Sequence, residues 1–265
     1  MRRLKRIIYG AAVFYIMIGT SLYFLQEKLI FLPTTLQEDF QFEFQHPFEE
    51  LFLNADDGAV INALHFKAEV PKGVILYFHG NAGDLSRWGN ITSYFVDKDY
   101  DVLVMDYRTY GKSKGKLSEK ALYDDALMCY SYLTKTYKEN EISIYGRSLG
   151  TGIATFIASA NSPKQLILET PYYSLVDVAK RRFPILPVSL FMKYRIPSFE
   201  FIKNVTCPIT MLHGNDDTVV AIESGKKLFD ASNHSQKTFI EIKAGRHNDL
   251  IDFETYRDTI DDILK

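Results

Sequence analysis

Short apolar, β-branched runs recur along the chain from residue 48 onward, with longer segments of mixed polarity between them. Two runs, 48–53 and 59–66, flank Asp57-Gly58, a turn dipeptide, and predict a hairpin. Six further runs predict buried parallel strands, at 74–78, 102–106, 142–145, 165–169, 209–213 and 238–242. The intervening segments predict helices, at 85–96, 118–137, 151–159, 223–231 and near 248–264. This alternation predicts an α/β domain, with a mostly parallel central sheet and helices on both faces.

The first 25 residues show a different pattern. Residues 1–6 are strongly basic, and the stretch 7–25 carries no charge. As a helix it would be about 28 Å long, roughly the thickness of a hydrocarbon core. A cleaved signal peptide or a buried helix are the rival interpretations, but residues 22–27 offer no small-residue cleavage site. We expect a membrane anchor over residues 1–27.

The basic residues at the start of the chain indicate an orientation for this anchor. Positive charge tends to stay on the cytoplasmic side of a membrane. We therefore expect a cytoplasmic N-terminus and a single-pass protein whose folded domain, residues 28–265, lies in a periplasm or an organelle lumen.

Composition limits the remaining choices. The chain has 265 residues, of which 46% are hydrophobic, enough for one substantial core. A net charge of −2 gives no reason to expect a nucleic-acid partner. Cys129 and Cys207 fall in a predicted helix and at a strand entry, which favours two unpaired core cysteines. The histidines show no metal-ligand spacing, so no metal is expected.

The most informative motif follows the strand at 142–145. There the chain reads Gly146-Arg147-Ser148-Leu149-Gly150 and continues into an apolar helical segment. A strand, a Gly-x-Ser-x-Gly turn and a helix together predict a nucleophile elbow, whose tight turn exposes the serine above the sheet. We expect Ser148 to be a catalytic nucleophile.

A serine needs a base and an orienting acid to act as a nucleophile at neutral pH. His247 follows the predicted strand 238–242, and Asp216 and Asp217 follow the strand 209–213. Ligands of open α/β sheets bind at this carboxyl edge of the strands. We expect His247 to be the base. The orienting acid would be Asp217 or Asp216, with Glu169, at the end of another strand, as a further alternative.

A glycine-rich loop follows the strand 74–78 and reads His79-Gly80-Asn81-Ala82-Gly83. Such a loop can direct a backbone N–H toward a developing oxyanion. We expect the Asn81 amide, or alternatively that of Ala82, to be the first donor and the Leu149 amide to be the second. His79 and His213 end strands before glycines, where histidines commonly brace loops.

Residues 171–205 interrupt the alternation of strands and helices with a proline-containing, partly apolar stretch. We expect this stretch to lie outside the sheet. Its apolar face would either receive an acyl chain, touch a membrane or simply pack on the core. Arg108 and Arg147 could meet a substrate anion, but we expect them to form structural ion pairs near Asp106 or Glu169.

The motifs together resemble the α/β-hydrolase superfamily, in which the triad follows the chain order serine, acid, histidine. The finer resemblance is to its membrane-anchored, Bem-forty-six-like branch, and it extends over nearly the whole chain. It is carried by the stretches 26–33, 79–83, 106–113, 146–150, 168–171 and 247–249, and by the pattern His-Gly-x-x-Asp-x-x-Val over residues 213–220. This family pattern favours Asp217 over Asp216 as the acid of the triad. The resemblance implies the fold, a short cap over the active site at about residues 171–205, and serine-hydrolase chemistry without a cofactor, but no particular substrate.

We therefore expect a membrane-anchored serine hydrolase that forms an acyl-enzyme. The cleaved bond could be an ester, a thioester or an amide, and a small cap beside a membrane favours an ester or thioester of a hydrophobic, lipid-like acyl group. Two alternatives stay open. One is a membrane-surface peptidase, in which Glu200 would bind the substrate's amine. The other is a non-catalytic scaffold of the same fold.

Overall fold

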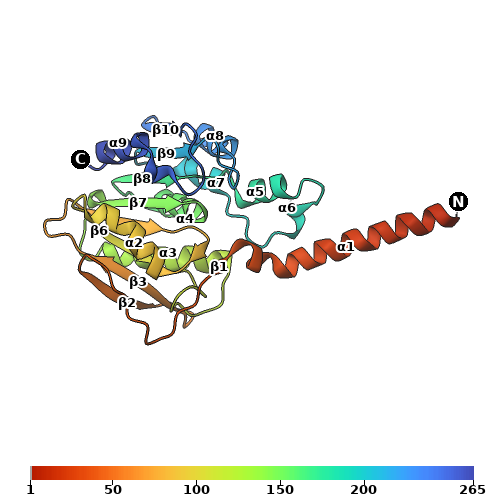
Figure 1. Cartoon of the computed structure of the whole chain (residues 1–265), viewed down its shortest axis with the longest axis horizontal. Coiled ribbons are helices and arrows are strands. Elements are labelled where there is room, and N and C mark those ends of the chain that lie inside the picture. Colours follow the sequence, from red (N-terminus) through yellow and green to blue (C-terminus); the bar gives the residue numbers. More distant parts are fainter. Residues whose placement is uncertain (1) are drawn as a thin grey trace.

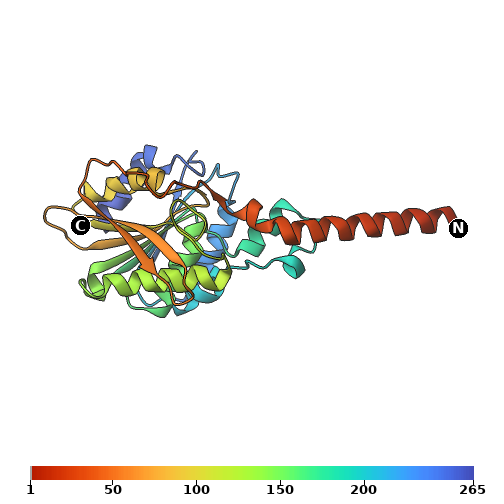
Figure 2. The ribbon, with the colours of Figure 1, turned by 90° about the horizontal axis from the view of Figure 1, so that it is seen from below.

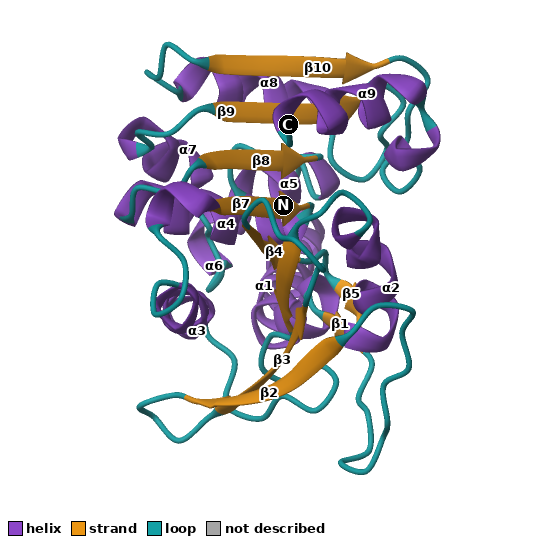
Figure 3. Cartoon of the chain, turned by 90° about the vertical axis from the view of Figure 1, so that its left-hand side faces the viewer, coloured by secondary structure: helices purple, strands orange, loops and turns teal. Residues whose placement is uncertain are grey.

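The computed structural model describes residues 2–265, and its centre is an eight-stranded sheet (Figure 3). The strand order is β10-β9-β8-β7-β4-β6-β3-β2. β2 and β3 pair antiparallel, as do β3 and β6, and the other neighbours are parallel. The strands span Phe48–Asn54 (β2), Val60–Phe66 (β3), Val74–Phe78 (β4), Asp101–Met105 (β6), Ile142–Arg147 (β7), Gln165–Glu169 (β8), Ile209–Gly214 (β9) and Lys237–Ile242 (β10).

Helices cover both faces of this sheet, as the sequence predicts (Figure 2). Side chains of β4 alternate between two cores: Leu76 joins the cluster that packs α3, α4 and α8, and Tyr77 joins the cluster that packs α2 and α9. This period of two explains why β4 is apolar throughout. The helices span Leu85–Val96 (α2), Glu119–Leu133 (α3), Leu149–Ala160 (α4), Ile222–Ala231 (α8) and Glu254–Ile263 (α9).

Two predicted helices differ from the structure at their ends. The predicted helix 118–137 ends at Leu133, where Thr134 and Thr136, which favour helix weakly, begin a turn. The predicted helix near 248–264 is broken into a short 3₁₀ turn over Leu250–Asp252 and α9. Phe253 separates the two with an extended backbone (φ −92°, ψ 136°), and residues 248 and 249 belong to the loop of His247, where Asp249 accepts a hydrogen bond from the amide of Arg246 at 2.6 Å.

A second, two-stranded sheet was not predicted. β1 (Leu32–Pro33) pairs in parallel with β5 (Ala82–Gly83), so the segment after the N-terminal helix lies against the loop that follows β4. The amide of Leu32 donates to the carbonyl of Asn81 at 2.8 Å. Strands of two residues carry too little periodicity to be recognised in a sequence.

The N-terminal helix α1 (Arg2–Ile30) extends away from the domain, and the C-terminus lies on the opposite side (Figure 1). By length and composition α1 could cross a membrane, and most of its apolar side chains are exposed. The C-terminal end of α1 lies beside the cap (Figure 1). The cap helices are α5 (Leu175–Arg182), α6 (Val188–Phe191) and α7 (Ser198–Phe201).

The C-terminal end of α1 is hydrogen-bonded to the cap, whereas the sequence pattern predicts an anchor that is separate from the domain. The Gln26 side chain donates to the carbonyl of Phe191 at 3.2 Å and accepts from the amide of Lys193 at 2.7 Å. The hydroxyl of Tyr194 donates to Glu27 at 3.0 Å. The helix continues to Ile30 and therefore joins the expected anchor and the domain without a break.

Candidate active site

Ser148 lies between β7 and α4 in a strained turn. Its φ of 51° and ψ of −116° are sparsely populated for a residue with a side chain. Its amide donates to the carbonyl of Glu169 at 2.9 Å, which fixes the turn to β8. A Cβ at Gly146 would lie 2.6 Å from that of Ala154, and one at Gly150 would collide with the carbonyl of Phe78. The two flanking glycines therefore allow the turn, as the motif predicts.

The structure brings the other two predicted residues to Ser148. Asp217 follows β9 and His247 follows β10, so both lie at the carboxyl edge of the sheet. Nδ1 of His247 is 2.7 Å from Oδ2 of Asp217, and Nε2 is 2.8 Å from Oγ of Ser148. A carboxylate only accepts hydrogen bonds, so Nδ1 carries the proton and Nε2 accepts from the serine hydroxyl.

The environment of Asp217 keeps its carboxylate ionised. Burial raises its pKa, but hydrogen bonds from His213, His247 and the amide of Val220 outweigh burial and hold the pKa well below its usual range. The amides of Val219 and Val220 donate to Oδ1 at 2.8 and 2.9 Å. A carboxylate with this many donors stays charged opposite a protonated imidazole.

Neither alternative acid reaches His247. Asp216 is exposed to solvent. Glu169 is buried in a different network, where it contacts Nε of Arg147 at 3.2 Å and accepts from the hydroxyl of Tyr145 at 2.7 Å. Arg147 therefore forms the expected structural ion pair.

Arg108 forms a structural pair with other carboxylates than expected. Its guanidinium binds Asp125 through two hydrogen bonds of 2.8 Å and also contacts Asp57, not Asp106 or Glu169. Asp125 lies about two turns into α3, on its buried side, and the sequence pattern alone does not pair it with residue 108.

Asn81 and Leu149, whose amides are the two predicted oxyanion donors, line the same cleft as Ser148. Within residues 2–265, neither amide donates to a protein acceptor. Leu149 is the first residue of α4, whose first amides have no partner inside the helix. Both N–H groups are thus free to bind a group in the cleft.

Aromatic hydroxyls hold the loop that carries Asn81. Tyr110 donates to the carbonyl of Asn81 at 2.6 Å, and Tyr107 donates to that of His79 at 2.7 Å. The buried ring of His79 donates from Nδ1 to the carbonyl of Gly80 at 2.6 Å, so His79 braces the loop as expected. His213 similarly contacts the carbonyl of Val220 at 2.9 Å. Sequence reasoning missed the two tyrosines, because their distance in sequence gave no sign of this contact.

The cleft above Ser148 has a volume of about 940 Å³ and lies between the sheet edge, the cap and the end of α1. Four cationic side chains line it. Arg181 pairs with Glu223 at 3.1 Å, and Lys227 with Asp177 at 3.2 Å. Lys180 and Arg182 have no carboxylate within salt-bridge distance in the part of the chain that the structure describes. Sequence reasoning assigned these two cations no role, although they sit in a basic run inside the cap.

The two cysteines and Glu200 lie apart from this site. Cys129 and Cys207 are free and buried, and burial raises the pKa of both thiols. Glu200 is exposed and does not line the cleft. Among residues 2–265, no three His, Cys, Asp or Glu side chains are grouped to hold a metal ion.

Comparison with known proteins agrees with this architecture. Residues 69–196 match the family described as "Serine aminopeptidase, S33". The chain is 34% identical over 187 residues to the lysophosphatidylserine lipase ABHD12 of Danio rerio, covering 62% of this chain and 48% of the lipase. It is 31% identical to the uncharacterized protein R595 of Acanthamoeba polyphaga mimivirus, covering 75% and 74% of the two chains.

The chain thus spans about half the length of the curated lipase that it matches. Among solved structures, an esterase of Pyrococcus furiosus superposes with a TM-score of 0.70 at 15% identity, covering 89% of this chain and 96% of the esterase. The sheet order, the elbow at Ser148 and these likenesses lead to one conclusion: the chain belongs to the α/β-hydrolase superfamily.

Proposed function

We propose that this protein is a serine hydrolase that cleaves an ester, or a thioester, of a hydrophobic acyl group. The observation that carries the proposal is the continuous hydrogen-bonded chain from Asp217 through His247 to Ser148, which ends at a serine lining an open cleft. In a nucleophile with an activating base, the serine is hydrogen-bonded to a histidine whose other ring nitrogen is held by an acid. A serine and a histidine without such a role would not need this arrangement.

The proposed reaction has two steps. Oγ of Ser148 attacks the acyl carbonyl while its proton moves to Nε2 of His247, and Asp217 stabilises the resulting imidazolium. The tetrahedral intermediate expels the alcohol or thiol, which takes the proton from His247. Water then attacks the acyl-enzyme with His247 again as the base, and the acid leaves while Oγ regains its proton.

The amides of Asn81 and Leu149 would stabilise the oxyanion of both intermediates. Both are unpaired in the described residues and line the cleft with Ser148. Removing one such donor typically costs about 3 kcal/mol of barrier. The hydrogen bond from Tyr110 to the carbonyl of Asn81 keeps that loop in place without using its amide.

The lining of the cleft favours a lipid ester with an anionic headgroup. Lys180 and Arg182 are cations without a partner carboxylate among the described residues, and both line the cleft together with Ser148. Phosphate and carboxylate groups are the natural partners of such side chains. The name of the similar Danio rerio protein, a lysophosphatidylserine lipase, points to the same class.

The apolar helix α1 supports a membrane anchor. It is 29 residues long, about 43 Å as a helix, and its outer residues expose apolar side chains on all sides. Such a surface is stable only in lipid or against another apolar surface. The basic residues Arg2 to Arg6 favour a cytoplasmic N-terminus and an extracytoplasmic cleft.

The alternatives find less support. An aminopeptidase needs a free carboxylate for the substrate's amine, but Glu200 lies outside the cleft, and Asp177 and Glu223 are already paired with cations. A non-catalytic scaffold has no need for the strained backbone of Ser148 or for its hydrogen bond to His247.

Labelling of the full chain in detergent with a fluorophosphonate tests the proposed nucleophile. We expect wild type to be labelled, Ser148→Ala to be unlabelled, and Ser162→Ala, an exposed serine outside the cleft, to be labelled like wild type. Folded wild type that resists the probe would contradict the proposal. Initial rates of hydrolysis, measured on esters of increasing acyl length and on lysophospholipids, then test the substrate class. Rates that do not rise with acyl length would count against a hydrophobic acyl group as the substrate.

A further inference from the structure

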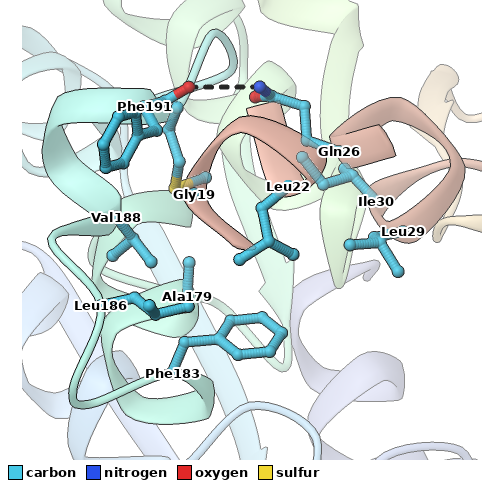
Figure 4. A pocket seen from close by; sticks show the side chains of 11 residues that line it. Gly19, Leu22, Gln26, Leu29, Ile30, Ala179, Phe183, Leu186, Val188 and Phe191 are labelled. Atoms are coloured by element: carbon cyan, nitrogen blue, oxygen red, sulfur yellow. Dashed lines mark hydrogen bonds between the residues drawn. The ribbon is translucent and has the colours of Figure 1, made fainter. Parts of the chain in front are cut away.

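A second cavity lies between α1 and the cap, beside the cleft of Ser148 (Figure 4). Gly19 and Leu22 of α1 form one wall, and Phe183, Leu186, Val188 and Phe191 of the cap form the other. We call this cavity the α1–cap seam. Its one polar lining residue, Gln26, already uses its amide in hydrogen bonds to backbone groups of α1 and the cap, so the seam offers only apolar surface.

The seam is continuous with the proposed active site. Five residues line both cavities: Leu29, Ile30, Ala179, Phe183 and Met192. The cleft has a volume of about 940 Å³ and the seam only about 80 Å³. A narrow apolar extension of a wider cleft that also carries charged side chains fits one extended hydrocarbon chain better than the two chains of a diacyl lipid.

We infer that the α1–cap seam holds the acyl chain of the substrate, while the carbonyl lies at Ser148. The inference rests on the proposed function and adds to it that the N-terminal helix is one wall of the substrate site. Lys180 and Arg182 line the cleft and not the seam, so the polar part of the substrate would stay in the cleft.

The position of the seam explains how a chain would reach it from a bilayer. It lies along α1, whose exposed apolar surface faces lipid under the proposed anchoring. Ile185 and Leu190 at the tip of the cap are 85% and 80% exposed, an apolar edge that adjoins the seam through Leu186 and Phe191. An acyl chain entering here would move from hydrocarbon to protein without crossing water, so its transfer would not cost hydrophobic free energy.

Two glycines of α1 allow a matched test in the full chain. A Cβ at Gly19 would lie 3.4 Å from the ring of Phe191, so a leucine there would extend into the seam, whereas nothing lies within 4 Å of a Cβ at Gly10. Ser148 is labelled with an ethyl and with a hexadecyl fluorophosphonate. We expect the ratio of hexadecyl to ethyl labelling rates to fall about tenfold in Gly19→Leu, the usual scale of an overfilled apolar site. Gly10→Leu should keep the wild-type ratio.

A second measurement uses unaltered protein and does not depend on the folding of a variant. A hexadecyl fluorophosphonate with a terminal diazirine is attached to Ser148 and irradiated, and the cross-linked peptides are identified by mass spectrometry. We expect cross-links within residues 19–30 of α1 and 183–192 of the cap. Cross-links elsewhere, or only to detergent, would show that the acyl chain does not lie in the seam. An unchanged ratio in Gly19→Leu would show the same. Neither result would affect the assignment of Ser148 as the nucleophile. Failure of both probes to label wild type would overturn the proposed function and the seam with it.

Discussion

Two neighbouring carboxylates follow β9, and their surroundings give them different chemistry. Asp217 turns into the protein, where it accepts hydrogen bonds from His247 and from two backbone amides. Asp216 points to solvent. The charge on the buried carboxylate is stabilised by several donors, which is the condition for holding an imidazolium beside it.

Substitution of the two aspartates should separate their roles. In Asp217→Asn the amide can donate to Nδ1, which would place the proton on Nε2 and leave His247 unable to accept from Ser148. We expect turnover of a short acyl ester to fall by ~10⁴-fold, the scale of this substitution in other serine hydrolases. Asp216→Asn should retain wild-type turnover. Equal losses in the two variants would contradict the assignment of Asp217.

The sequence predicts much of this site because its residues lie in the short loops that follow predicted strands. Ser148, Asp217 and His247 each come shortly after a strand, and parallel strands carry such residues to one edge. The choice between Asp216 and Asp217 required a family pattern, because both follow the same strand. The partner of Arg108 could not be predicted, since Asp125 reaches it only through the packing of α3.

The elbow between β7 and α4 tests how local backbone geometry supports the site. A methyl group at Gly150 would collide with the carbonyl of Phe78 on the neighbouring strand β4. We expect Gly150→Ala to lower the free energy of unfolding by about 3 kcal/mol, the upper range for overpacking. Ser159→Ala, later in the same helix and partly exposed, should change it by less than about 0.5 kcal/mol. Denaturant unfolding measures both, and a Gly150→Ala variant as stable as wild type would refute the close approach of the elbow to β4.

Strand β3 carries a buried titratable group far from the cleft. The ring of His65 lies within 3.1 Å of the hydroxyl of Tyr132 and 3.0 Å of Nζ of Lys67. Burial, and secondarily the charge of Lys67, lower the pKa of His65 to about 4, although Asp101 raises it. Because an ammonium only donates, Nε2 must accept from it, so the folded state holds a neutral histidine.

Stability should therefore depend on pH through this histidine. The pKa in the unfolded chain is about 6.5, so between pH 6.5 and 4 the unfolded state binds more protons than the folded state. The contribution of neutral His65 is complete above pH 6.5 and is lost as the pH falls toward 4. We expect the free energy of unfolding of His65→Gln to fall less over this window than that of wild type. A His65→Gln variant whose free energy of unfolding falls as steeply as that of wild type over this window would contradict this account.

At the level of elements, prediction failed where structure depends on contacts distant in sequence. The central strands were located by their apolar runs, within one or two residues of their observed ends. The β1–β5 sheet was not predicted, since each strand has two residues and is defined only by its partner. The short cap helices lie among prolines and have no periodic face long enough to recognise.

For the whole molecule, the relation of α1 to the domain was the main feature that the sequence did not indicate. A run of apolar residues predicts a helix that is long enough for a membrane, but not what its last turns contact. Gln26, Glu27 and Ile30 bind or approach the cap and the loop of Asn81, whose side chain donates to the carbonyl of Ile30 at 3.1 Å. The position of a membrane relative to α1 would consequently determine the position of the cleft.

The proposed orientation can be tested by cysteine labelling, because Cys129 and Cys207 are 0% and 4% exposed and should stay unlabelled in the folded protein. Val70 is 78% exposed on the domain, and Leu4 is 62% exposed among the basic residues of α1. With the protein produced in a bacterial inner membrane, we expect a membrane-impermeant maleimide to label Val70→Cys from the periplasm and Leu4→Cys only after the cells are permeabilised, since positive charge favours the cytoplasm. The parent protein should remain unlabelled in both cases. The reverse pattern would place the cleft in the cytoplasm. Because α1 and the cap are bound together, an acyl chain of the substrate would then have to enter the seam from the cytoplasmic leaflet.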